Sequence, residues 1–259
     1  MPLVEIERFE GAARLWLNRP QQHNALTAEL ARELADACHT LAHDVTVRVV
    51  ILAGRGPSFC AGADIAAMKA SASSSLEDNL AEAQRLGGMF ATLADLPKPV
   101  VARVHGNVFG GGVGLICACD IAVASADATF ALSEVRLGIV PALISPYVIR
   151  RLGDRASREL MLTGERIGAT RALEVGLVNH VVKPEELDAK VSERALALLQ
   201  GAPQAQRRIK MLLELWADST WEEYRASLPR TLAEVRSSAE AKEGLGAFLE
   251  KRKPSWQGS

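Results

Sequence analysis

The residues that could do chemistry gather around a run of glycines. Gly110, Gly111 and Gly112 are consecutive in the segment FGGGVGLICACD, and Gly114 follows after one valine. Glycine lacks a Cβ, so a ligand can approach the main chain closely at these positions. Backbone N–H groups at a helix start, with the helix dipole behind them, can stabilise an oxygen that gains negative charge. Close packing of a helix on a strand is the competing interpretation of the same glycines.

Three better-known glycine motifs do not fit this segment. A phosphate-binding P-loop needs a Lys–Ser/Thr pair after its last glycine, and none follows here. The GxGxxG spacing of dinucleotide-binding loops is absent from this run. The GxSxG elbow of serine hydrolases occurs nowhere in the chain.

A developing oxyanion is rarely held by one donor, so a second loop of small residues is expected. The segment CAGADIAAM, residues 60–68, follows a buried strand and has no bulky side chain at Ala61, Gly62 and Ala63. The sequence therefore predicts two loops of exposed main chain that face one ligand oxygen.

The elements that must position these loops alternate between strand and helix. Residues 3–18 predict a β-hairpin around Gly11, and Thr27 can cap a helix that runs to about residue 43. Buried strands are expected at 47–54, 98–106 and 120–125, with a loop at 55–68, a helix at about 80–94 and a short apolar helix after the glycines. This alternation predicts an α/β core.

After Pro146 the pattern changes to successive helices. In the segment 203–216, Ile209, Leu212, Leu213 and Trp216 recur at helical spacing. We expect a core at residues 1–200 and a helical region at 201–259 that packs on this core or on a neighbouring subunit.

Composition excludes several classes of partner. The 259 residues include 30 basic and 31 acidic side chains, for a net charge of −1, so we expect neither nucleic acid nor a membrane surface as partner. The four cysteines form no CxxC pair and no cluster has metal-ligand spacing, which predicts reduced core thiols and no metal. There is no leader pattern at Met1 and no apolar run of about 18 residues, so a cytoplasmic protein is expected.

Five segments together carry a family resemblance. LNRPQQHNALT, FCAGADIAAM, HGNVFGGGVGLICACDIAVAS, FALSEVRLGIVP and AKEGLGAFLEKRKP resemble, in order and over essentially the whole chain, the crotonase (enoyl-CoA hydratase/isomerase) superfamily. The resemblance implies a spiral core of ββα units and a C-terminal helical region that mediates assembly into a homotrimer or a dimer of trimers. It also implies an acyl-CoA thioester substrate and no separate cofactor, because coenzyme A is part of the substrate.

The resemblance assigns roles to positions of this chain. It implies an oxyanion hole formed by the N–H groups of Ala63 and Gly111, with Gly110 and Gly114 beside the substrate. Phe248 and Lys251 match C-terminal positions that reach CoA, often from the neighbouring subunit, and an ammonium at Lys251 suits a phosphate. The remaining positions implied to line the CoA path are Gln22, His23, Ala25, Ala61, Asp64 and Ile65.

The acid/base group is where this chain departs from the family pattern. Family hydratases usually carry two glutamates, and Glu134 in SEV matches the second of them. The first falls on Gly114, which cannot transfer a proton. Apolar residues flank Glu134 and predict a raised pKa for its carboxyl.

Gly114 leaves three possibilities open. The enzyme could hydrate with Glu134 alone and a water held by other groups. It could isomerise a double bond, with one carboxylate carrying a proton between two carbons. Alternatively, position 114 is empty in order to admit a bulkier or branched acyl group.

A finer resemblance favours hydration of a branched substrate. Gly114 together with SEVRLG and ISPYV resembles the methylglutaconyl-CoA hydratase-like branch, which acts on branched, carboxylate-bearing enoyl-CoA esters. Lys69 and Arg136 are candidate partners for a substrate carboxylate, and Ser145 and Tyr147 are either polar pocket groups or structural residues. The expected activity is enoyl-CoA hydration; the alternatives are a Δ3-Δ2 enoyl-CoA isomerase and a catalytically weak acyl-CoA-binding protein.

Overall fold

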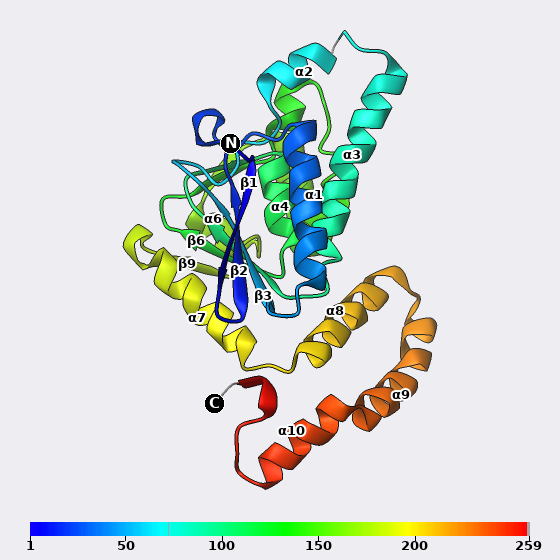
Figure 1. Ribbon diagram of the computed structural model, residues 1–259. Helices are drawn as coiled ribbons and strands as arrows, with labels where there is room; N and C mark the ends of the chain where they lie inside the picture. Colours follow the sequence, from blue (N-terminus) through cyan, green and yellow to red (C-terminus); the bar gives the residue numbers. More distant parts are fainter. Residues whose placement is uncertain (72, 258–259) are drawn as a thin grey trace.

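The inner strands of the main sheet are apolar on both faces because helices cover both of them. The computed structural model describes residues 1–71 and 73–257, and Figure 1 shows the sheet beside its helices. Its strand order is β1-β2-β3-β4-β6-β9, with β1 and β2 antiparallel and the other neighbouring strands parallel. The strands are β1 (Val4–Phe9), β2 (Ala12–Leu17), β3 (Val49–Gly54), β4 (Val100–Val104), β6 (Ile121–Ser125) and β9 (His180–Val182).

A second, smaller sheet lies beside the first, and its first strand leads into the glycine run 110–112. It has the order β5-β7-β8, from β5 (Asn107–Phe109), β7 (Thr129–Ala131) and β8 (Arg166–Gly168). The helices are α1 (Ala28–His43), α2 (Ile65–Ser71), α3 (Leu76–Ala94), α4 (Gly111–Ala118), α5 (Ser145–Thr163), α6 (Ala169–Glu174), α7 (Leu187–Leu199), α8 (Pro203–Asp218), α9 (Trp221–Ser237) and α10 (Ala239–Leu249).

Strand β3 shows why these strands read as continuous apolar runs. Val50 and Leu52 belong to the larger core, which also contains the buried faces of α1 and α3. Val49 and Ile51 point to the opposite face and pack in a separate cluster with α7. Successive side chains of a strand alternate between faces, so every residue of β3 is buried.

The predicted hairpin and first helix are confirmed, and so is the α/β core. β1 and β2 are joined at Gly11, whose φ of 70° is the left-handed conformation that glycine adopts readily. The Thr27 hydroxyl accepts a hydrogen bond from the Leu30 N–H at 3.2 Å and so caps α1.

Two predictions of secondary structure are wrong in part. The segment predicted as a loop, 55–68, contains the start of α2, because the Asp64 carboxylate accepts hydrogen bonds from the N–H groups of Ala66 and Ala67. The region predicted as purely helical contains β8 and β9, and strands of three residues are too short to show an alternating pattern.

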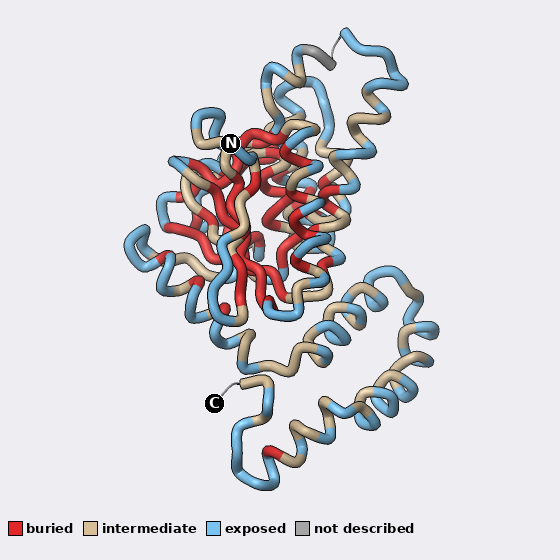
Figure 2. The backbone as a smooth tube through the Cα atoms, viewed as in Figure 1, coloured by how far each residue is buried: buried red, intermediate tan, exposed pale blue. Residues whose placement is uncertain are grey.

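The C-terminal helices leave much of their apolar surface uncovered. Figure 1 shows α8, α9 and α10 extending away from the core, and Figure 2 shows them mostly exposed or half-buried. The side chains of Ile209, Leu213 and Trp216 are each more than half exposed. Soluble proteins seldom leave an apolar stripe of this kind unpartnered, so the stripe indicates an interaction surface.

Arg48 attaches the C-terminal segments to the core. Its Nη2 donates to the carbonyls of Leu199 at 2.8 Å and Gly201 at 2.6 Å, and its Nη1 donates to the carbonyl of Trp256. One guanidinium thus joins the start of β3, the α7–α8 connection and the C-terminal segment.

Replacement of Arg48 by methionine should lower the free energy of unfolding by about 2–3 kcal/mol, because three partly buried carbonyls lose a charged donor. Urea denaturation measures this loss. Arg32→Met is the matched control, because the Arg32 side chain is 62% exposed and pairs with Asp36 one turn away, a contact worth about 0.5 kcal/mol or less. Equal losses in the two variants would contradict the attachment role of Arg48.

Candidate functional site

A cavity of about 180 Å³ lies where the two predicted loops meet. It contains all three positions predicted to be catalytic, Ala63, Gly111 and Glu134. The rest of its lining is apolar and comes from α3, from the segment 139–144 that precedes α5 and from the residue before the N-cap of α1: Leu26, Leu86, Phe90, Ile139, Val140, Pro141, Ala142, Leu143 and Ile144. The structure therefore brings the predicted catalytic residues together in one apolar pocket.

Backbone hydrogen bonds join the two loops directly. The Cys60 N–H donates to the Asn107 carbonyl at 3.3 Å, and the Phe109 N–H donates to the Cys60 carbonyl at 3.0 Å. These contacts form a short parallel bridge between Cys60 and Val108. The loop that carries Ala63 is consequently held alongside β5, just before the glycine run.

Two glycines permit this close approach of main chain to main chain. A Cβ on Gly112 would lie 2.3 Å from the Cys60 carbonyl oxygen. A Cβ on Gly62 would lie 2.8 Å from the Phe109 carbonyl oxygen, and its φ of 91° also favours glycine. The small residues are thus required on both sides of the contact.

The amides of Ala63 and Gly111 are left available to a ligand. Leu26 donates its N–H to the Gly62 carbonyl at 2.7 Å and accepts at its own carbonyl from the Asp64 N–H at 3.0 Å, which brackets Ala63. No backbone hydrogen bond within the described chain uses the Ala63 N–H. Gly111 is the first residue of α4, where an N–H has no acceptor within its own helix. Both donors line the cavity.

Glu134 reaches the same cavity from β7. Glu134 lies in a 3-10 helix, η2 (Ser133–Leu137), which follows this strand. The end of β7 is joined to the glycine run, because the Gly110 N–H donates to the Ala131 carbonyl at 2.9 Å. A Cβ on Gly110 would lie 2.8 Å from the Glu134 Oε1, and Gly110 has a φ of 47°. Gly110, predicted to lie beside the substrate, thus makes room for the Glu134 carboxylate.

The surroundings of Glu134 suit a proton-transfer group. Its Oε2 is buried and has no hydrogen-bond partner among the described residues. Loss of solvent raises the pKa of the Glu134 carboxyl above its ordinary value. A carboxylate that is poorly solvated is a stronger base than one in water, and this favours proton abstraction.

The space over Gly114 is filled rather than empty. A Cβ at this position would lie 2.2 Å from the Cγ2 of Ile144 and 3.0 Å from the Cε1 of Phe90. Ile144 and Phe90 line the cavity, whereas Gly114 lies behind them. Of the three possibilities that Gly114 left open, a vacancy that admits acyl bulk does not fit the structure, because the Ile144 side chain already occupies that volume.

Most of the predicted CoA positions lie together beside Ala63. The Ala61 N–H donates to the His23 carbonyl at 2.9 Å. Arg19 donates to the Ala25 carbonyl at 2.5 Å and pairs with the Asp64 carboxylate at 3.0 Å.

The side chains at these positions have different exposures. Ile65 is 83% exposed, and Gln22 is exposed in the 3-10 helix η1 (Pro20–Gln22). The Asp64 carboxylate already accepts hydrogen bonds from the Ala67 N–H and from Arg19. These hydrogen bonds lower the pKa of the Asp64 carboxyl. Asp64 would therefore contribute to a CoA path through its main chain or by holding Arg19.

Phe248 and Lys251 lie far from the other predicted positions. Phe248 is 78% exposed near the end of α10, and Figure 1 places α10 at the opposite end of the molecule from α2. A single chain does not bring these two residues to the cavity.

Asn24 is a site-supporting residue that sequence reasoning missed. Its buried side chain donates to the carbonyls of Arg55, Ser58 and Phe59 at 2.8–3.1 Å, and its Oδ1 accepts from the Arg19 N–H at 2.8 Å. It thus fixes the segment that leads into Cys60. Its only signal in the sequence was its place within the segment LNRPQQHNALT.

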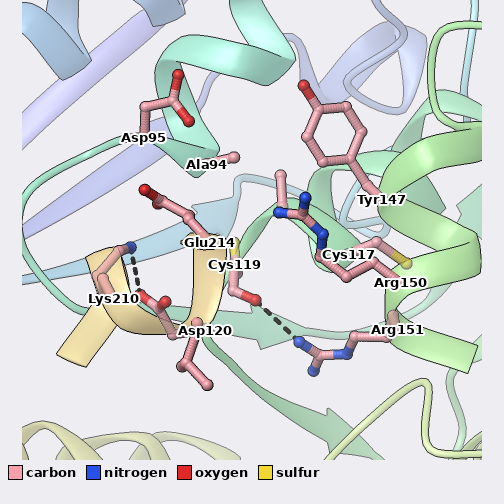
Figure 3. Close-up of a pocket in the computed structure, with 12 residues that line it drawn as sticks. Ala94, Asp95, Cys117, Cys119, Asp120, Tyr147, Arg150, Arg151, Lys210 and Glu214 are labelled. Atoms are coloured by element: carbon pink, nitrogen blue, oxygen red, sulfur yellow. Dashed lines mark hydrogen bonds and ion pairs between the residues drawn. The ribbon is translucent and has the colours of Figure 1, made fainter. Parts of the chain in front are cut away.

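A second cavity, of about 230 Å³ and hereafter the polar cavity, has charged side chains in its lining, and of the residues that the sequence proposed for a pocket it contains only Tyr147 (Figure 3). Its cations are engaged: Lys210 pairs with Asp120 at 2.9 Å, and Arg151 donates to the Cys119 carbonyl at 2.8 Å. Tyr147 lines this cavity rather than the apolar one, and its ring packs on Phe90 with centroids 6.1 Å apart. Ser145 begins α5 and donates its hydroxyl to the Ala142 carbonyl.

The remaining sequence predictions concern thiols, metals and membranes. The four cysteines are free, and burial raises the pKa of the Cys60 thiol to about 12. Across residues 1–71 and 73–257, no group of three or more His, Cys, Asp or Glu side chains is arranged to hold a metal ion. Within the same residues, no helix has the length and apolar character needed to cross a membrane.

Burial of Glu134 predicts a pH-dependent difference in stability. A carboxyl whose pKa is higher in the folded state contributes stability below its unfolded pKa, and this contribution is lost as pH rises through the folded value. Glu134→Gln removes this titration. The variant's gain in free energy of unfolding over the parent should therefore be larger at pH 8 than at pH 4 in chemical denaturation. A gain that shrinks as pH rises would contradict the burial of this carboxylate.

Comparison with known proteins agrees with the geometry. Residues 7–259 match the family model described as enoyl-CoA hydratase/isomerase. The short-chain-enoyl-CoA hydratase of Clostridium acetobutylicum is 35% identical over 96% of this chain and 95% of its own length. The crotonyl-CoA hydratase of Syntrophomonas wolfei is 34% identical over 98% of this chain and 97% of its own length.

A solved structure extends the likeness to three dimensions. The crystal structure of an enoyl-CoA hydratase from Shewanella pealeana superposes with a TM-score of 0.94 at 37% identity, covering 98% of this chain and 96% of that one. The predicted crotonase-type fold with its C-terminal helical region is thereby confirmed. The chain belongs to the enoyl-CoA hydratase/isomerase, or crotonase, family.

Proposed function

We propose that this protein hydrates α,β-unsaturated acyl-CoA thioesters. The observation that carries the proposal is the meeting of one desolvated carboxylate, Glu134, and two available amides, those of Ala63 and Gly111, in one apolar cavity. Such a site supplies what addition of water across a conjugated thioester needs: a base, and donors for the charge that develops on the carbonyl oxygen.

The chemistry assigns one role to each group. Glu134 removes a proton from a water molecule while the oxygen of that water bonds to C3 of the enoyl group. The C2–C3 π electrons move toward the thioester carbonyl. The N–H groups of Ala63 and Gly111 stabilise the resulting enolate oxygen, and loss of one such donor typically costs about 3–4 kcal/mol. Glu134 then returns the proton to C2, which completes the addition of water.

A double-bond isomerase is the second candidate. Among the described residues that line the cavity, Glu134 is the one titratable side chain. Moving a proton from C2 to C4 of a 3-enoyl thioester needs one carboxylate and no water. The same two amides would stabilise the dienolate oxygen formed in that reaction.

For the acyl group we propose a short, branched and apolar chain. The cavity offers aliphatic and aromatic contacts to a methyl branch. The 3-methylglutaconyl ester, which the finer motif resemblance indicates, carries a free carboxylate at the end of its acyl chain. Lys69 is exposed on α2, Arg136 donates to the Thr163 carbonyl, and neither lines the cavity. That carboxylate would therefore have to lie in solvent at the cavity mouth.

We also propose that the chain assembles as a homotrimer or a dimer of trimers. The uncovered apolar stripe of α8, with Ile209, Leu213 and Trp216, supports such an assembly. So does the distance of Phe248 and Lys251 from their own chain's cavity, because a neighbouring subunit could supply them to CoA.

An absorbance assay separates the candidates. We expect purified protein to consume the conjugated-enoyl signal of crotonyl-CoA and 3-methylglutaconyl-CoA, and Glu134→Gln to lower kcat by at least about 10²-fold while CoA-ester binding persists. Appearance of that signal from a 3-enoyl-CoA alone would identify an isomerase. Silence with all three esters would leave an acyl-CoA-binding protein and overturn the proposal.

Gly112→Ala tests the contact that positions the amides. The new Cβ would collide with the Cys60 carbonyl and displace the Ala63 loop, so kcat/KM should fall about 10²–10³-fold, as for loss of one oxyanion donor. Gly88→Ala on α3 is the matched control, because a Cβ there meets open space and should leave turnover within about twofold while stabilising the helix slightly. Equal activity of the two variants would contradict the positioning role.

A further inference from the structure

We propose that Ile144 is the residue that limits the size of the acyl group, and that Gly114 sets where Ile144 sits. This inference rests on the proposed function, because it concerns the acyl pocket of the same site. The two residues act as a pair: the main chain of one leaves a space, and the side chain of the other fills it.

The pair lies at the place where an acyl chain must go. Gly111 and Gly114 are three residues apart on α4 and so present the same face of the helix. The ring of Phe90 covers both, lying 3.7 Å from a Cβ built on Gly111 and 3.0 Å from one built on Gly114. A thioester oxygen held at the Gly111 N–H therefore directs the acyl carbons toward Phe90 and Ile144.

Ile144 is buried and its backbone is anchored. It is 3% exposed, and it ends the segment 139–144 that forms one wall of the cavity. Its carbonyl accepts a hydrogen bond from the Val148 N–H at 3.0 Å, so its backbone is part of the first turn of α5. A buried isoleucine at this point ends the pocket.

The backing of this wall is also well defined. Phe90 packs on Tyr147, which lines the polar cavity of Figure 3. The apolar pocket and the polar cavity thus share the Phe90–Tyr147 contact as a partition. Removing Ile144 lengthens the pocket along α4 toward this partition, into a region that stays apolar on the Phe90 side.

The pairing predicts opposite effects from its two partners. Ile144→Ala removes the side chain that fills the volume over Gly114, so the pocket lengthens. Gly114→Ala places a Cβ 2.2 Å from the Ile144 Cγ2, so Ile144 must shift, and the open side available to it is the cavity. In the double variant the 2.2 Å contact with the Ile144 Cγ2 is gone, whereas the Cβ atoms at 114 and 144 would still lie 2.8 Å apart, so the conflict is reduced.

The experiment compares kcat/KM for crotonyl-CoA and trans-2-octenoyl-CoA in the parent, the two single variants and the double variant. Ile144→Ala should raise the octenoyl-to-crotonyl ratio at least tenfold, and Gly114→Ala should lower it and lower Tm. Adding Ile144→Ala to Gly114→Ala should raise the ratio again, and it should lower Tm by less than Ile144→Ala lowers it in the parent, a non-additive result. Ile149→Ala, on the partly exposed side of α5 outside the cavity, is the matched control and should leave the ratio unchanged.

Two further measurements keep the outcome decisive. Ile144→Val makes a smaller cut in the same side chain, and it should move the ratio in the same direction if the alanine variant does not fold. Calorimetric affinities for butyryl-CoA and octanoyl-CoA should follow the same order as the kinetic ratios.

The affinities separate failure of this inference from failure of the proposed function. A parent protein that hydrates neither ester would overturn the proposed function, and the affinity ratios would still decide the role of Ile144. Folded Ile144 variants whose kinetic and affinity ratios both stay within twofold of the parent would overturn the present proposal.

Discussion

The whole site depends on one contact in which main chain packs against main chain. The Cys60–Ala63 loop and the β5–α4 junction approach so closely that Gly62 and Gly112 have no room for a Cβ. The sheet makes this meeting possible, because β3 and β4 are parallel neighbours and their carboxyl ends leave the sheet at the same edge. Without that contact the amides of Ala63 and Gly111 would belong to two unrelated loops.

The apolar cavity strengthens the hydrogen bonds that these amides can donate to a ligand. Hydrogen bonds and partial charges act more strongly where water is excluded, and they need not reorganise during the reaction. The same exclusion of water destabilises the ionised form of Glu134, whose Oε2 has no partner in the described chain. Folding thus maintains a poorly solvated carboxylate beside Gly110, and in the proposed reaction this desolvation makes the carboxylate a stronger base.

The sequence could predict those features that local patterns express. The alternation of apolar and polar residues predicted the hairpin, and the Thr27 cap predicted α1. Small residues in two segments predicted the Ala63 and Gly111 loops. Other features depend on contacts between distant residues and leave no local pattern. Ile144 fills the space over Gly114 from 30 positions away, so a bare glycine looked like an empty pocket. The buried hydrogen bonds of Asn24 were missed for the same reason.

In the proposed reaction, the N–H groups of Ala63 and Gly111 both bind the thioester carbonyl oxygen of the substrate. Difference infrared spectroscopy of a ¹³C=O-labelled enoyl-CoA bound to the Glu134→Gln protein tests it directly, since this variant retains the donors without turning the substrate over. We expect the carbonyl stretch of the bound ester to be clearly lower in frequency than that of the ester in water. When Gly112→Ala is added to this variant, the decrease in frequency should be smaller. A bound ester whose carbonyl stretch matches that in water would contradict this binding.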